Sequence, residues 1–255
     1  MIARFRTLTA ATVAMLLALV AAAAQADSAH GTWNITSVHG TLQLEMRWES
    51  PDGHSNNDHS GDVDANALGI ADAINSSGKH ATFALHREAG DFAFEGLVGN
   101  GEGVGNYTFT PNDAFFASLR NRGYDVTMMD YKMAFADLDI TKDFVDQMES
   151  LGLKSDVSNL IALKALGVSQ QYVHDLQAAG VTDISPQQII ALRALHVDAA
   201  YVNEIGGAGF PHLAAGQYVT LKAVRVDAAY IRYLRSHGFK NLTVDQVVGM
   251  KAERI

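Results

Sequence analysis

The chain has 255 residues, no cysteine and a formal net charge of −9, with 28 acidic against 19 basic side chains. This length allows one large domain or two small ones, and without cysteine the fold contains no disulfide. The acidic balance argues against nucleic-acid binding, because contact with phosphates needs a basic surface.

The first 26 residues have the pattern of an export signal. Arg4 and Arg6 precede an apolar stretch of Ala, Leu and Val that ends in the small-x-small sequence Ala24-Gln25-Ala26. This pattern predicts a signal peptide at 1–26 that is cut after Ala26. The stretch is shorter than the roughly 20 residues of a membrane-spanning helix, so an uncleaved anchor is the weaker alternative. We therefore expect a periplasmic or secreted protein with no stable membrane span once the signal is removed.

Residues 27–110 show the two-residue alternation that is typical of β-strands. Apolar and polar residues alternate in four segments, at 42–48, 82–86, 91–98 and 104–110. Asn100-Gly101 between the last two segments is a strong hairpin signal. We expect a small antiparallel sheet of about five strands, and we expect the polar segment 49–79 to form a loop that holds at most a short helix.

Two patterns in this domain match known motifs only in part. Ser76-Ser77-Gly78-Lys79 fits the S-x-x-K motif of penicillin-recognising enzymes, but the S-D-N and K-T-G partner motifs do not occur. The glycines between Gly96 and Gly105 do not follow the order of a phosphate-binding loop. A polar turn and a glycine-rich hairpin are the better interpretations.

Imidazoles and carboxylates gather in one polar loop, at His54, Asp58, His59, Asp62 and Asp64. These groups are suited to a divalent metal, but their spacing fits no standard site, and Ala67 stands where a calcium loop needs glycine. We interpret the segment as a solvated acidic loop and leave metal binding open. The sequence predicts no cofactor and no assigned metal site.

Residues 111–255 contain five copies of a repeat of about 29 residues. In each copy, a helix begins at a residue type that caps helix N-termini and ends before a glycine. The caps are Asn112, Thr141, Ser169, Asp198 and Asp227, and the glycines are Gly123, Gly152, Gly180, Gly209 and Gly238. Second helices follow at 159–168, 188–197, 217–226 and 246–255, with a more divergent first copy at 129–140.

Such repeats bury their apolar faces by stacking on one another. We therefore predict an α+β protein, with an antiparallel β domain at 27–110 and an α-solenoid of five two-helix repeats at 111–255. A helix-hairpin-helix DNA module is the disfavoured alternative, because the chain is acidic and carries five copies.

The stretch REAGDFAFEGLVGNGEGVGNYTFTPNDAFFASLRNRGY, at 87–124, resembles an uncharacterised bacterial exported module. Similar regions follow the membrane part of some relatives of the BlaR1-type peptidases and also occur as free secreted proteins. The resemblance implies the same layout of a β-domain and helical repeats. It implies no peptidase activity, since the chain contains no H-E-x-x-H motif.

Two columns of side chains recur along the repeats. The aromatic column lies three residues after each cap, at Phe115, Phe144, Tyr172, Tyr201 and Tyr230. These residues lie on the apolar face of their helices, which favours core packing. The basic column in the second helices consists of Lys164, Arg193, Lys222 and Lys251.

The basic column has two interpretations. Each cation lies in the last turn of its helix, where it complements the helix dipole or pairs with a neighbouring carboxylate. The alternative is a positive stripe that binds an acidic partner, strengthened by Arg225, Arg232, Arg235 and Lys240.

The favoured functional hypothesis is an exported, non-enzymatic binding or scaffold protein of the cell envelope. Its helical-repeat surface is expected to bind a protein or an anionic envelope polymer, because solenoids form extended binding surfaces. The first alternative is an envelope hydrolase whose carboxylates come together only in the fold. The second is a sensory module in the envelope or antibiotic stress response.

Overall fold

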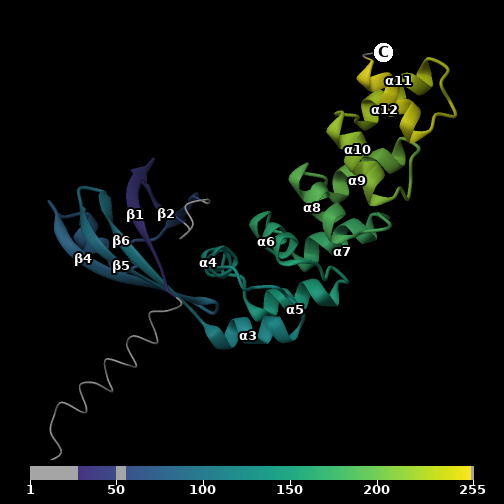
Figure 1. Ribbon diagram of the computed structural model, residues 1–255. Coiled ribbons are helices and arrows are strands. Elements are labelled where there is room, and N and C mark those ends of the chain that lie inside the picture. The colour runs from purple at the N-terminus through teal and green to yellow at the C-terminus, as the bar shows by residue number, and fades with distance from the viewer. Residues whose placement is uncertain (1–27, 50–55, 254–255) are drawn as a thin grey trace, which may run out of the picture. The chain divides into compact units, whose positions relative to one another are not determined.

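The chain divides into two compact units that differ in secondary structure (Figure 1). The computed structural model describes residues 28–49 and 56–253, with backbone alone for 49 and 56–60. The first unit comprises the residues up to Ser118 together with Thr127–Ala136, and the second comprises Leu119–Val126 and the residues from Asp137 onward. A sheet dominates the first unit and helices build the second, so the fold class is α+β, as predicted.

The first unit contains a six-stranded sheet in which all neighbouring strands are antiparallel. The strands are β1 Ala29–Val38, β2 Thr41–Glu49, β3 Asn56–Val63, β4 Lys79–Arg87, β5 Gly90–Gly99 and β6 Glu102–Pro111, and their order is β3-β2-β1-β6-β5-β4. The four alternating segments of the sequence are β2, β4, β5 and β6. Asn100 and Gly101 form the predicted turn between β5 and β6, with φ angles of 55° and 82°.

The prediction for the segment 49–79 was wrong in one part. Asn56–Val63 is strand β3, which pairs with β2 along its whole length. Its sequence, NNDHSGDV, is polar except for Gly61 and Val63 and shows no alternation. As an edge strand, β3 is held by main-chain hydrogen bonds to a single neighbour, which the side-chain pattern does not reveal. The expected short helix does occur, as α2 at Ala71–Ile74.

The core of the sheet is built around Trp33, which is 2% exposed. The indole Nε1 donates a hydrogen bond to the carbonyl oxygen of Asn106 at 3.0 Å, and the ring centroid lies 5.1 Å from that of Phe83. A Cβ at Gly103 would lie 2.9 Å from the indole, and one at Gly105 would collide with it and with the neighbouring strand. The glycines of β5 and β6 therefore make room for Trp33, which accounts for the glycine-rich sequence of this hairpin.

Two helices follow the sheet. Helix α3, at Asp113–Asn121, begins in the first unit and ends in the second, and helix α4, at Met129–Asp137, belongs almost wholly to the first. Asn112 caps α3, as predicted, since its Oδ1 accepts from the backbone N–H of Phe115 at 3.2 Å. Its Nδ2 also donates to the carbonyl of Glu88 at 3.0 Å, so this one side chain fixes the helix to the β4–β5 turn. Phe115 and Phe135 are both fully buried, with ring centroids 6.1 Å apart.

The second unit consists of helices in two rows (Figure 1). The helices are α5 Lys142–Ser150, α6 Val157–Ala165, α7 Gln170–Ala178, α8 Pro186–Ala194, α9 Ala199–Gly207, α10 Ala215–Ala223, α11 Ala228–Ser236 and α12 Val244–Ala252. α7, α9 and α11 contact one another in order, and so do α6, α8, α10 and α12. No described helix is both long and apolar enough to cross a membrane.

The predicted helix caps of this unit are confirmed. Thr141, Ser169, Asp198 and Asp227 each accept a hydrogen bond from the backbone N–H three residues later. The glycines that follow the first helices all have positive φ, from 73° at Gly152 to 112° at Gly209. This left-handed conformation ends each helix.

Candidate binding surface

The aromatic and basic columns meet within each helix pair. The basic side chain of the second helix lies over the aromatic ring of the first helix. The distances from the cation to the ring centroid are 5.2 Å for Lys164 over Phe144, 4.9 Å for Arg193 over Tyr172, 4.2 Å for Lys222 over Tyr201 and 4.2 Å for Lys251 over Tyr230. We call this recurring contact the cation–ring clasp.

The clasp gives the basic column a role that neither sequence interpretation contained. All four cations are half-buried, with their aliphatic stems against the helix pair and their charged groups over a ring. In the described part of the chain, none of the four pairs with a carboxylate. The sequence contained the signal, since the two columns recur with a constant separation of 20 or 21 residues.

Two tyrosines of the aromatic column also close their helix pairs by hydrogen bonds. The hydroxyl of Tyr172 donates to the carbonyl oxygen of Val197, and that of Tyr201 to the carbonyl oxygen of Val226, both at 2.7 Å. Burial raises the pKa of Tyr172 to about 12 and that of Tyr201 still further. Each ring therefore holds a cation on its face while its hydroxyl binds the end of the second helix.

Replacing Tyr201 with phenylalanine is expected to lower the free energy of unfolding by about 1 kcal/mol, because the buried carbonyl of Val226 loses its donor. The matched control is Tyr233→Phe, since Tyr233 lies on α11 with 53% of its surface exposed. Urea unfolding followed by far-ultraviolet circular dichroism measures both variants. Equal stability of the two variants would contradict a structural role for the Tyr201 hydroxyl.

Arg193 makes one further contact, which joins neighbouring helix pairs. Its Nε donates to the carbonyl oxygen of Leu166 at 3.0 Å, at the C-terminal end of α6. A cation at this place complements the helix dipole and satisfies a carbonyl that has no partner within the helix. Arg193 thus contacts the C-terminal end of the preceding second helix, whereas the sequence interpretation concerned the end of its own helix.

A charged network holds α5 to the segment before it. The guanidinium of Arg122 lies 2.7 Å from an oxygen of Asp146 and 2.9 Å from an oxygen of Glu149. The hydroxyl of Tyr124 donates to the other oxygen of Glu149 at 2.8 Å. The hydrogen bond from Arg122 is the main cause that lowers the pKa of Glu149.

This lowered pKa predicts a pH-dependent stability. The Glu149 carboxylate stabilises the fold at neutral pH, and its contribution is lost as the pH falls through the folded-state pKa. Glu149→Gln is therefore expected to be less stable than the wild type at neutral pH by about 1 kcal/mol, with the gap closing in acid. Urea midpoints across the acid range measure the gap, and the exposed Glu204→Gln serves as control. A gap that is the same at every pH would contradict this role.

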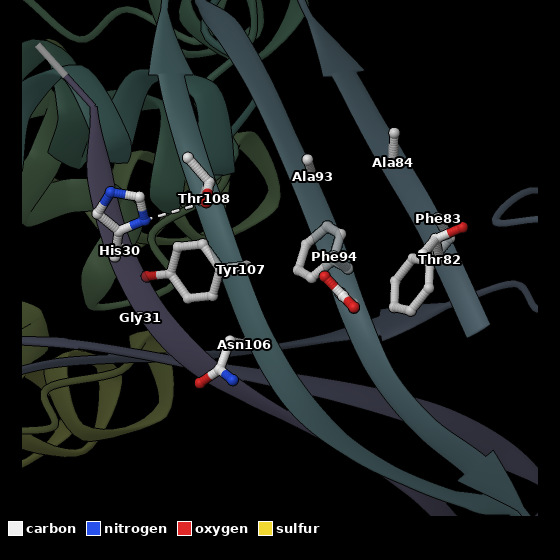
Figure 2. Close-up of a pocket in the computed structure, with 11 residues that line it drawn as sticks. His30, Gly31, Thr82, Phe83, Ala84, Ala93, Phe94, Asn106, Tyr107 and Thr108 are labelled. Atoms are coloured by element: carbon white, nitrogen blue, oxygen red, sulfur yellow. Dashed lines mark hydrogen bonds between the residues drawn. The ribbon is translucent and has the colours of Figure 1, made fainter. Parts of the chain in front are cut away.

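A second candidate site is a groove of about 740 Å³ on the outer face of the sheet (Figure 2). Two cross-strand rows form it. Ala84, Ala93, Thr108 and His30 lie opposite one another in the first row, and Thr82, Glu95 and Asn106 lie in the second. The groove is deepest over Ala84 and Ala93 because their side chains are the shortest in these two rows.

The groove is polar around its alanine floor. His30 Nδ1 lies 3.0 Å from the hydroxyl of Thr108, a contact that Figure 2 marks with a dashed line. Beside the groove, His80 Nε2 lies 3.2 Å from a carboxylate oxygen of Glu95. His30, His80 and Glu95 are solvent-accessible. Sequence reasoning missed this groove, because its residues belong to four strands and only the pairing of those strands brings them together.

The other sequence candidates lie elsewhere. Ser76 forms a local turn, with its hydroxyl donating to the carbonyl of Ala73 at 2.7 Å, as expected for a polar turn. Asp64 accepts from the backbone N–H of Asn66 at 2.9 Å. His54 and the side chains of Asp58 and His59 lie outside the described residues, and within those residues no three groups gather as for a metal ion.

Comparison with protein families, curated proteins and solved structures finds no match for this chain. The resemblance to the exported module that accompanies BlaR1-type peptidases therefore stays a prediction.

Proposed function

We propose that the chain is a non-enzymatic binding or scaffold protein of the cell envelope, and that residues 111–255 act as an α-solenoid of five two-helix repeats. The support is the recurrence of one unit, since the helix cap and the glycine turn occur in all five copies and the clasp occurs in the last four. A unit that recurs with constant spacing presents the same side chains at regular intervals. Such a surface is suited to an extended partner.

The observation that carries the proposal is the state of the basic column. Lys164, Arg193, Lys222 and Lys251 are each placed by a ring and have no carboxylate partner among the described residues. A ring face attracts a cation without neutralising its charge, so the cation keeps its attraction for an anion. The four cations are therefore an ordered row of charges, and their partly buried stems reduce the conformational entropy that binding would cost.

The partner that this row fits best is an acidic, extended segment of another protein. Carboxylates spaced along such a segment can pair with successive cations, and clasps in successive helix pairs fix the positions of those cations. The same chemistry would also attract an anionic envelope polymer, so the test must separate the two sources. Export by the predicted signal peptide would place the protein beside both.

Three lysines of the column offer a matched test. The triple variant Lys164→Gln, Lys222→Gln, Lys251→Gln removes the charges, and the triple variant with arginine at these positions keeps both charge and ring contact. Affinity capture from detergent-extracted cell envelope, read by mass spectrometry and by sugar analysis, is expected to retain a partner on the wild type and the arginine variant but not on the glutamine variant. Circular dichroism verifies that all three are folded.

Equal capture by the glutamine variant would overturn the proposal that the basic column binds the partner. A retained polysaccharide without protein would replace the protein partner by an anionic polymer.

A further inference from the structure

A group of cations and exposed rings lies at the C-terminal end of α11 and in the segment that follows it. Arg232, Tyr233, His237, Phe239 and Lys240 all have exposed side chains, and we call this set the tip patch. Tyr233 is 53% exposed and Phe239 is 42% exposed. The segment 232–240 holds no carboxylate.

The tip patch departs from the repeat in its exposed rings. The residues that correspond to Phe239 in earlier copies are Tyr124, Leu153, Val181 and Phe210, which are 4%, 1%, 5% and 8% exposed. Lys154 lies over the ring of Tyr124 at 5.6 Å, and Arg235 lies over that of Phe210 at 5.8 Å. Among the described residues, no cation lies over the ring of Phe239.

The tip patch also departs from the repeat in charge. The residues that correspond to Arg232 are Ala117, Asp146, His174 and Asn203, and those that correspond to Tyr233 are Ser118, Gln147, Asp175 and Glu204. At these two positions the first helix of each repeat therefore carries a neutral or acidic residue until α11, where the two residues are basic and aromatic. Residues 211–255 carry 7 basic and 3 acidic side chains in a chain that is acidic elsewhere.

The patch is held in place by local contacts. Tyr233 and His237 lie one turn apart, and their ring centroids are 4.2 Å apart. His237 Nδ1 also lies 2.9 Å from the carbonyl oxygen of Tyr233, so the two rings form one raised surface at the end of α11. Arg232 precedes Tyr233 in α11, and Lys240 follows Phe239 just beyond the helix, with all four side chains exposed.

We propose that the tip patch docks on the surface of an anionic lipid bilayer. Arg232 and Lys240 would lie among the lipid phosphates, and Tyr233 and Phe239 would enter the interfacial region between headgroups and acyl chains. Cations attract the protein to a negative membrane surface, and amphipathic or apolar rings next to them hold it there. This site is separate from the basic column, so the proposal stands or falls independently of the proposed function.

Vesicle sedimentation tests the proposal with the full chain purified after export from a bacterial host. The vesicles contain phosphatidylethanolamine with 30% phosphatidylglycerol in one set and phosphatidylcholine alone in the other. The test variant is Arg232→Gln with Lys240→Gln. The control variant is Arg120→Gln with Lys79→Gln, which removes the same charge at exposed positions on α3 and β4 that do not belong to the tip patch.

The wild type is expected to sediment with the anionic vesicles and to stay in solution with phosphatidylcholine. Loss of two cations in the test variant is expected to weaken its partition onto the anionic vesicles by about 30-fold, because each cation contributes separately to binding at a negative membrane surface. The control is expected to bind like the wild type, and Phe239→Ser to bind at least about 5-fold more weakly. Absence of binding to the anionic vesicles, or equal binding by the test and control variants, would overturn the proposal.

Discussion

Replacing Gly105 with alanine is expected to unfold the first unit and to leave the helical unit folded. A Cβ at this position would collide with the carbonyl oxygen of Glu95, with the Cα of Gly96 and with the indole of Trp33. Two of these three neighbours are backbone atoms of the paired strand β5, so no side-chain movement can relieve the contact. We expect a cost of about 4 kcal/mol or more, which is a large part of the stability of a small domain.

The two tryptophans of the chain make this effect measurable, since Trp33 and Trp48 both lie in the sheet. Their fluorescence is expected to shift to that of solvent-exposed indole, while most of the helical circular dichroism remains. The matched control is Gly207→Ala, because a Cβ at that exposed position in α9 meets nothing within 4 Å. Alanine there is expected to stabilise the helix by about 1 kcal/mol. Native tryptophan fluorescence in Gly105→Ala would contradict the packing of Trp33 on the glycines.

Removal of residues 169–197 is expected to give a shorter protein that still folds. This deletion takes out α7 and α8 as one pair and joins Val168 to Asp198, which is again a valine followed by a helix cap. If the helix pairs are equivalent units, α9 can pack where α7 packed. We expect cooperative thermal unfolding and the loss of helical signal from two helices only.

A shorter deletion is expected to do more harm. Removal of residues 169–183 takes out α7 alone and joins α6 directly to the segment that precedes α8. Helix α9 then loses α7, the preceding helix of its row that it contacts, and α8 remains without the first helix of its pair. We expect low helical content and rapid proteolysis. A more stable protein from the 15-residue deletion than from the 29-residue deletion would contradict equivalent helix pairs.

The helices were predictable from the sequence because their signals are local. A cap such as Asp198 bonds to the backbone three residues later, and a glycine such as Gly209 ends the helix by its own backbone conformation. Strand β3 escaped prediction because its polar residues give no alternation, and only main-chain pairing with β2 defines it. A local pattern cannot report a partner that lies elsewhere in the chain.

The candidate binding surfaces were predictable only in part, because their contacts also join residues that lie far apart in the sequence. Lys222 and Tyr201 were each recognised as members of a column, but their contact crosses a turn and depends on how two helices pack. The sheet groove was invisible, since His30 and Thr108 are 78 residues apart and become neighbours only through strand pairing. Residues 232–240 were noted for their charge, whereas the exposure of Phe239 required the structure.

Lysine footprinting tests, without any substitution in the chain, whether the basic column faces a partner. The acetylation rates of single lysines are measured by mass spectrometry, with and without the captured envelope partner. A partner bound at the basic column is expected to slow the acetylation of Lys164, Lys222 and Lys251 and to leave the rate unchanged at Lys79, which lies exposed on β4. Unchanged rates at all three column lysines, with a partner bound, would contradict binding at the basic column.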